Sequence, residues 1–251
     1  MIKFENVSVT INNKQILKNI SCTINTGDFI VIVGPNGAGK STFFDMISGK
    51  RIPTNGKILL DDTDITHLSE QHRATLISRL FQNPQLNGVA SMTVAQNLAL
   101  SNYKSKRVSL CNGMKKFPAN LANELNKLNL GSEKILNTPM KDLSGGQRQL
   151  LAFIMATILP PRLFMLDEPT AALDPQSATN LLQFAVKFIN EHSLTTLLIT
   201  HDPELALAIG KKIWILENGQ ITKQFDTHDV IRLSAADLIG HIDYKNLMKS
   251  N

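Results

Sequence analysis

The stretch DFIVIVGPNGAGKST, residues 28–42, decides the fold. Its first part, DFIVIV at 28–33, is a short apolar run of the kind that forms a buried strand in a parallel sheet. The residues that follow match the pattern G-x-x-x-x-G-K-[ST] and lead into a helix predicted from about Gly39 to Ser48. A strand that enters such a turn and a helix that leaves it favour a phosphate-binding loop over a glycine turn without a ligand.

Each residue type in this loop is suited to phosphate binding for a physical reason. Glycines let successive backbone N–H groups point inward at phosphate oxygens, and the positive end of the following helix faces the same phosphates. Lys40 is placed to reach the β- and γ-phosphates, and Ser41 offers its hydroxyl to Mg²⁺. The sequence therefore predicts ATP and Mg²⁺ as ligands. The predicted nucleotide contacts are Gly34, Pro35, Asn36, Gly37, Ala38, Gly39, Lys40, Ser41 and Thr42.

The remainder of the chain predicts an α/β fold. After residue 160, apolar strands alternate with amphipathic helices, which predicts a mainly parallel core sheet covered on both faces. The strands are expected at 163–166, 195–200 and 213–216, and the helices at 175–191 and 203–209. Further strands are expected at 2–9 and 16–24, joined by a polar turn, at 56–60, and at 220–224 after the turn Asn218-Gly219.

The segment from 88 to 142 differs in composition from its surroundings. It is rich in Asn, Lys and Leu, with leucines at helical spacing at positions 121, 125 and 128. Together with a helix from Ser144 to Leu159 it predicts a helical subdomain at about 88–159. The core and the N-terminal antiparallel β subdomain are then formed by 1–87 and 160–225. A C-terminal tail at 226–251 is predicted to be helical from Ser234 to about Met248.

A second motif, LFMLDE at 163–168, ends an apolar strand in two adjacent carboxylates. Ligands of open parallel sheets bind at the carboxyl ends of the strands. We expect Asp167 to hold Mg²⁺ through water, and Glu168, on the opposite side of the chain, to act as general base toward the attacking water. The pair by itself is equally compatible with a solvated strand end, and the loop at 34–41 makes catalysis the stronger interpretation.

A third motif, LSGGQ at 143–147, lies at the start of a helix. Its residues offer a hydroxyl and free backbone N–H groups at the positive end of that helix, which makes a second anion site. One chain then has two cradles for one γ-phosphate. A head-to-tail homodimer resolves this, because each ATP can lie between the loop of one copy and the second cradle of the other. The residues of that cradle are Ser144, Gly145, Gly146 and Gln147.

These motifs and their order resemble those of the ABC ATPases over about residues 2–225. LSGGQ is similar to the signature motif of that family. Three further segments resemble its Q-loop, its D-loop and its switch histidine: Gln82 in FQNP, Asp174 in ALD and His201 in ITHD. The resemblance implies the P-loop ABC-ATPase fold in a single domain, ATP hydrolysis, and a homodimer in the ATP state.

The resemblance also assigns roles to single residues. It implies that Gln82 and His201 take part in catalysis beside Glu168, with His201 contacting the γ-phosphate from the end of a strand next to that of Asp167. Gln82 would join Ser41 and Asp167 at the metal. Asp174 would join the residues that contact nucleotide.

The chain departs from the family pattern in two places. Many members stack an aromatic residue on adenine, but the corresponding stretch here is TIN at 10–12, with Ile11 as the nearest apolar candidate. Adenine packing would then be aliphatic and would lack the ring-stacking contribution. Where the family often has two arginines after the signature, this chain has Leu150 and Met155. With SMTVAQNL at 91–98, these departures resemble a narrower subgroup of uptake-type ATPases, some of which are assigned to aromatic amino acids.

The composition of the chain limits the classes of partner and the cellular compartment that are expected. The net charge of +5 is mild and dispersed, and the densest basic stretch, 104–116, has only Tyr103 and Phe117 beside it, which is thin for stacking on single strands. We therefore predict no nucleic-acid partner. The two cysteines lack metal-type spacing and favour a reducing compartment. The apolar run 150–159 is too short to cross a bilayer, and the N-terminus has no signal-peptide core.

The subgroup resemblance implies two further partners, a membrane-embedded permease subunit and an extracytoplasmic substrate-binding protein. The predicted location is the cytoplasmic face of the inner membrane, as a peripheral subunit of an import system. Two alternatives stay open at this point. One is a soluble ABC ATPase outside transport, such as one in iron–sulfur cluster assembly. The other is a small-molecule kinase with the same phosphate loop, which would leave Ser144–Gln147 without a role.

Overall fold

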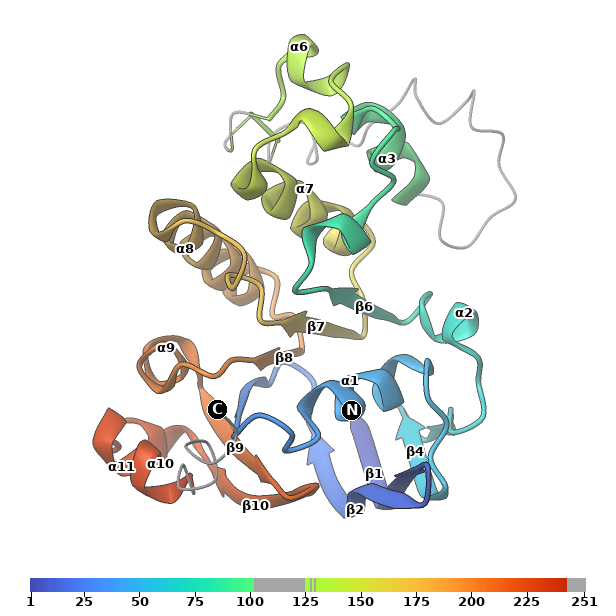
Figure 1. Cartoon of the computed structure of the whole chain (residues 1–251), viewed down its shortest axis with the longest axis vertical. Coiled ribbons are helices and arrows are strands. Elements are labelled where there is room, and N and C mark those ends of the chain that lie inside the picture. Colours follow the sequence, from blue (N-terminus) through green and yellow to red (C-terminus); the bar gives the residue numbers. More distant parts are fainter. Residues whose placement is uncertain (102–124, 127, 129, 243–251) are drawn as a thin grey trace.

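The computed structural model describes residues 1–101, 125, 126, 128 and 130–242. The predicted basic stretch at 104–116, the leucine at 121 and the end of the predicted tail helix at 243–248 lie outside the described residues. Within the described part, two sheets lie side by side, with a group of helices at the far end of the molecule from the N-terminal sheet (Figure 1).

The larger sheet has six strands in the order β10-β9-β3-β8-β7-β6. Neighbours from β6 to β9 run parallel, and β10 closes the edge antiparallel to β9. The predicted mainly parallel sheet is therefore confirmed. Its strands are β3 (Phe29–Val33), β6 (Ile77–Leu80), β7 (Leu163–Asp167), β8 (Thr196–Ile199), β9 (Lys212–Glu217) and β10 (Gln220–Phe225). Strand β6 was not predicted from the sequence, because ISRL is short and has an arginine in its middle.

The smaller sheet is antiparallel, with the order β2-β1-β4-β5. Its strands are β1 (Ile2–Ile11), β2 (Lys14–Ile24), β4 (Asn55–Leu60) and β5 (Thr63–Asp64). Its apolar face packs on helix α1 (Lys40–Ser48), where the rings of Phe4 and Phe43 lie 5.4 Å apart between centroids. The phosphate-loop helix is thus clamped between the two sheets.

Strand β3 separates two apolar cores because its side chains alternate between the faces of the sheet. Ile30 and Ile32 pack with α1 and the antiparallel sheet. Phe29, Val31 and Val33 pack on the other face. That second face is covered by α7 (Gly145–Thr157), α8 (Pro175–Glu191), α9 (Pro203–Ile209), α10 (Thr227–Val230) and α11 (Ala235–His241). Helix α11 begins where the tail helix was predicted to begin, but it ends at His241, and Ile242 already has an extended backbone.

A third apolar cluster forms on the side of α7 that faces away from the two sheets (Figure 1). There α7 packs with α3 and α6 through leucines and methionines that include Leu98, Met140 and Leu151. The short elements of this region are η1 (Pro84–Asn87), α3 (Val94–Ser101), α6 (Glu133–Leu136) and η2 (Met140–Asp142). Helix α2 (Glu70–Arg73) lies apart from them, before β6. In the part of the chain that the structure describes, no helix has the length and apolar character needed to span a bilayer.

Candidate nucleotide-binding site

The site forms where four neighbouring strands of the parallel sheet end. Strands β3, β8, β7 and β6 are consecutive in the sheet and point the same way, so their carboxyl ends meet at one edge. The phosphate loop follows β3, and Asp167 ends β7. His201 follows β8, and Gln82 follows β6. The prediction that the strand before His201 lies beside that of Asp167 is confirmed.

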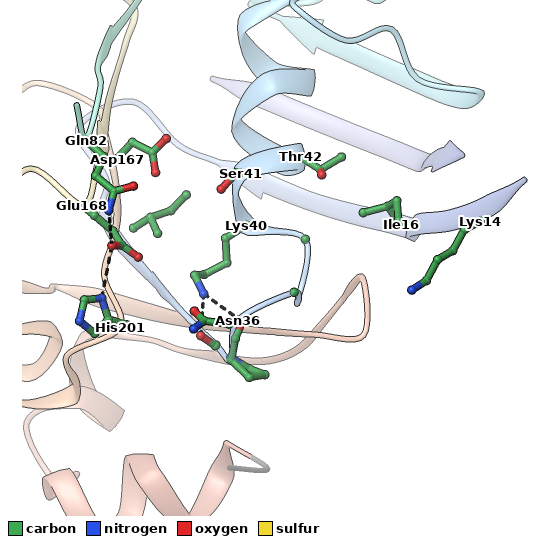
Figure 2. A pocket seen from close by; sticks show the side chains of 15 residues that line it. Lys14, Ile16, Asn36, Lys40, Ser41, Thr42, Gln82, Asp167, Glu168 and His201 are labelled. Atoms are coloured by element: carbon green, nitrogen blue, oxygen red, sulfur yellow. Dashed lines mark hydrogen bonds and ion pairs between the residues drawn. The ribbon is translucent and has the colours of Figure 1, made fainter. Parts of the chain in front are cut away.

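These strand ends line a cavity of about 760 Å³. Figure 2 shows the loop with Lys40 in the middle, Gln82, Asp167, Glu168 and His201 on one side, and Lys14 and Ile16 on the other. The structure therefore brings together most of the residues proposed from the sequence. Those that line the cavity are Gly34, Pro35, Asn36, Gly37, Gly39, Lys40, Ser41, Thr42, Gln82, Asp167, Glu168 and His201.

The start of α1 is built to face an anion. Gly39 takes the N-cap position with φ of 104°, and no side chain caps the helix there. The first N–H groups of α1 are thus left for a ligand. A Cβ on Gly39 would lie 2.9 Å from Leu17 Cδ2, and a φ of this sign favours glycine in any case. Ala38 is buried beneath the loop and does not line the cavity.

Lys40 points back across its own loop. Its Nζ donates hydrogen bonds to the carbonyl oxygens of Gly34 at 2.7 Å and of Pro35 at 3.0 Å. Burial lowers the pKa of Lys40, while the nearby carboxylates of Glu168 and Asp167 act in the opposite direction. A desolvated ammonium that faces two carboxylates is well placed to attract the phosphates of a nucleotide.

Glu168 lies at the centre of a small polar group. Its Oε2 accepts a hydrogen bond from Gln82 Nε2 at 3.2 Å and lies 3.3 Å from His201 Nδ1. Its backbone has φ of 43°, in the left-handed region that non-glycine residues rarely adopt. Among the described non-glycine residues with positive φ, Glu168 is the one that lines the cavity, and strained backbone is often found at functional sites. The geometry thus unites the three residues expected to take part in catalysis.

Asp167 has a partner that the sequence reasoning missed. Arg79 Nη2 lies 2.5 Å from Asp167 Oδ2, and Arg79 Nη1 lies 2.6 Å from Asp45 Oδ1 on α1. Because Arg79 belongs to the unpredicted strand β6, no local pattern pointed to it. Asp167, Ser41 and Gln82 line the same cavity and supply carboxylate, hydroxyl and amide oxygens, which are the donor types that Mg²⁺ prefers.

Ile11, proposed from the sequence as the adenine contact, is placed elsewhere. It is the last residue of β1, and its side chain packs against the core cluster around α1 without lining the cavity. At that end of the cavity the structure places Lys14 and Ile16 instead, both from β2. The turn between β1 and β2 decides which side chains face the cavity, and the apolar pattern alone does not reveal it.

The signature segment lies away from the cavity of its own chain. Ser144 and Gln147 cap α7 reciprocally: Ser144 Oγ accepts from Gln147 N at 3.2 Å, and Gln147 Oε1 accepts from Ser144 N at 3.1 Å. Asp174 caps α8 by accepting from Ser177 N at 3.0 Å. None of the residues 144–147 and 174 lines the cavity.

Gly146 fixes how closely α7 and α8 approach. A Cβ at this position would lie 2.6 Å from Ser177 Oγ and 2.8 Å from Ser177 Cβ. We expect Gly146→Ala to lower the free energy of unfolding by about 1–3 kcal/mol through overpacking. At neighbouring Gly145 a Cβ would meet Leu173 Cδ2 at an ordinary 3.7 Å. Gly145→Ala is therefore the matched control, expected to be neutral or stabilising by up to about 1 kcal/mol. Urea denaturation of both variants measures the difference, and equal stabilities would contradict this packing.

Comparison with known proteins agrees with this geometry. The model of the ABC transporter family matches residues 17–171. The chain is 35% identical over 249 residues to the tyrosine transport ATP-binding protein of Clostridioides difficile (strain R20291), covering 97% of this chain and 99% of that protein. It is 35% identical over 220 residues to a probable sulfate/thiosulfate import ATP-binding protein of Chlorella vulgaris, covering 88% of this chain and 89% of that protein.

Solved structures give the same family. The dimeric structure of MJ0796, a bacterial ABC transporter cassette, aligns with a TM-score of 0.74 at 29% identity, covering 90% of this chain and 99% of that one. A dimeric post-hydrolysis state of the same cassette, bound to ADP and Pi, aligns with a TM-score of 0.73 at 28% identity and covers the same shares.

The curated relatives described above carry transport names, which decides against the alternatives of cluster assembly and of a small-molecule kinase. The family match, the fold and the convergence of the phosphate loop with Glu168 lead to one conclusion. The chain belongs to the ABC transporter family, as an ATP-binding cassette that binds and hydrolyses ATP to energise transport.

Proposed function

We propose that this cassette drives the import of a solute through a membrane permease, by closing as a homodimer around two Mg·ATP. The observation that carries the proposal is the separation within one chain of the phosphate loop and the second predicted anion site. The phosphate loop lines the cavity, whereas Ser144–Gln147 does not. A second copy, turned head to tail, would supply its signature segment and its Asp174 to complete each site. The dimeric structure of the related cassette MJ0796 supports the pairing of two copies.

The side chains around the cavity support a division of roles. Lys40 and the N–H groups at the start of α1 bind the phosphates. Glu168 takes the proton of the attacking water, Gln82 orients that water, and His201 contacts the γ-phosphate. Ser41, Gln82 and Asp167 would hold Mg²⁺, which would supply positive charge to neutralise the phosphates. Loss of the γ-phosphate after hydrolysis removes the group that joins the two copies, so the dimer opens.

A groove beside Gln82 fits the expected contact with a permease. A cavity of about 160 Å³ lies between β6, η1 and α7, and next to it Leu86 exposes 64% of its surface. We propose that a short coupling helix of the permease binds here. Phe81 lines the groove and adjoins Gln82, so a change at the nucleotide can be transmitted to the bound helix. This would hold the cassette at the cytoplasmic face of the inner membrane.

The solute proposal rests on one relative. The Clostridioides difficile protein, which matches nearly end to end, is named for tyrosine transport, and the sequence motifs resemble a subgroup assigned in part to aromatic amino acids. We propose an aromatic amino acid as the solute, delivered by an extracytoplasmic binding protein. The cassette contacts the carrier and not the cargo, so its own residues do not encode this choice.

Two measurements test the proposal. Affinity purification of the cassette from detergent-solubilised membranes is expected to recover a polytopic membrane protein, and recovery of soluble partners alone would contradict a transport role. Cells that carry only Lys40→Ala are then expected to lose ATP-dependent uptake of labelled tyrosine. Normal uptake of tyrosine, with a defect for another solute, would refute the solute while leaving the import role in place.

A further inference from the structure

Arg79 joins the phosphate-loop helix to the strand that carries the proposed metal ligand. Its guanidinium contacts Asp45 of α1 at 2.6 Å through one nitrogen and Asp167 of β7 at 2.5 Å through the other. The contact to Asp167 spans 88 positions of sequence, and the contact to Asp45 spans 34. Arg79 is therefore a link between two segments that must keep a fixed spacing for the site to bind Mg·ATP.

The link is shielded from solvent. The exposed fractions of the side chains are 9% for Arg79, 12% for Asp167 and 16% for Asp45. The Cζ of Arg79 also lies 4.8 Å from the centre of the Phe81 ring and 5.7 Å from that of Phe44. Both Nη nitrogens are bonded, while Nε is buried without a hydrogen-bond partner. A planar guanidinium that is packed against rings and paired at both Nη nitrogens has little freedom to move. Unlike an exposed ion pair, this one can fix the orientation of its partner.

The contact leaves one carboxylate oxygen of Asp167 for the cavity. Arg79 binds Oδ2, and Asp167 lines the nucleotide cavity, so Oδ1 is the oxygen available there. We propose that Arg79 is a positioning residue for the metal: it holds Asp167 by Oδ2, presents Oδ1 to Mg²⁺, and is itself held in register with α1 by Asp45. The proposal rests on the metal role of Asp167 set out above.

The cluster of Arg79, Asp45 and Asp167 keeps a net negative charge, so Arg79 can position Asp167 without competing with the metal for it. Two carboxylates and one guanidinium leave one net negative charge, so the cluster still attracts a cation. Lys50 approaches Asp45 only to 3.9 Å and its side chain is 57% exposed, so it adds little to this balance. Because Asp45 pairs with part of the positive charge of Arg79, part of the negative charge of Asp167 remains available to the metal.

The test is a titration of Mg²⁺ against a fixed concentration of a fluorescent, non-hydrolysable ATP analogue bound to the full chain. We expect Arg79→Met to raise the Mg²⁺ concentration at half-maximal effect about three- to tenfold, since a free carboxylate must be ordered when the metal binds. Affinity for the analogue in EDTA is expected to stay within about twofold, because the phosphate contacts of Lys40 and α1 do not involve Arg79.

Two further variants separate positioning from general stability. Arg79→Lys is expected to give an intermediate midpoint, because an ammonium lacks the planar fork that pairs with both carboxylates. Asp45→Asn keeps the pair with Asp167 but removes its anchor, and is expected to raise the midpoint less than Arg79→Met. Arg162→Met is the matched control, since Arg162 is 69% exposed and reaches Asp61 only at 3.9 Å. It is expected to leave the midpoint unchanged.

The outcomes are distinct. A folded Arg79→Met variant with an unchanged midpoint, or with a lower one, overturns the proposal, the latter because it would mean competition with the metal. If Arg79→Met does not fold, an unchanged midpoint in both Arg79→Lys and Asp45→Asn overturns it equally. If the nucleotide affinity of the wild-type protein does not depend on Mg²⁺, the metal site itself is refuted. If every variant shows the normal dependence on Mg²⁺, only the role of Arg79 is refuted.

Discussion

ATP turnover by Glu168→Gln is expected to fall at least about a hundredfold, with ATP binding retained. The carboxylate at position 168 is the group that faces both Gln82 and His201 at the edge of the cavity. Glutamine has nearly the same shape and can keep a hydrogen bond to either neighbour, but its amide cannot take a proton from water. The γ-phosphate therefore stays in place, and so does the contact that holds two copies together.

The Glu168→Gln variant is also expected to remain a dimer while ATP is bound. With Mg·ATP, the Glu168→Gln protein should elute as a dimer in size-exclusion chromatography, and with ADP it should elute as a monomer. Glu191→Gln is a suitable control, because Glu191 is 54% exposed at the end of α8 and lies outside the cavity. It should hydrolyse ATP at the normal rate. Full turnover by Glu168→Gln would refute the base assignment, and an ATP-bound protein that stays monomeric at every concentration would refute the shared site.

Arg73→Met is expected to lower the free energy of unfolding by about 3–5 kcal/mol. Arg73 has an exposed fraction of 0% and donates four hydrogen bonds to backbone carbonyl oxygens. Two of these are accepted by Met46 and Ile47 in the last turn of α1, where Met46 O also accepts a longer bond of 3.3 Å from Gly49 N. The others belong to Thr66 and Leu68 in the connection before α2.

Two opposing effects determine the stability of Arg73→Met. Burial lowers the pKa of Arg73 to about 10, so the group stays protonated at neutral pH but at a desolvation cost. Methionine removes that cost. It also leaves the carbonyl oxygens of Ile47, Thr66 and Leu68 without the guanidinium donor, at about 1–3 kcal/mol for each buried one, and this loss is the larger. Urea denaturation measures the result. Arg73→Lys should lose less, and a stability equal to wild type in Arg73→Met would contradict the capping role.

The sequence alone was sufficient wherever the signal is local. The phosphate loop, the alternation of strands and helices after residue 160 and the two carboxylates that end β7 follow from patterns of a few residues. Hydrophobic periodicity and turn chemistry act over such distances, which is why β3, α8 and β8 lie where they were predicted. The parallel order of β8, β7 and the unpredicted β6 then places Gln82, Glu168 and His201 at one edge.

Only the tertiary structure decided which distant groups meet. The sequence did not predict β6, and with it missed the contacts of Arg79; it also did not reveal the burial of Arg73 under α1. It proposed Ile11 as the adenine contact, whereas Lys14 and Ile16 of β2 line the cavity and Ile11 does not. Contacts of this kind join residues far apart in the chain, and their partners become neighbours only when the sheets close on α1. Local propensity carries no information about that closure, because its energy comes from packing between elements and not from the elements themselves.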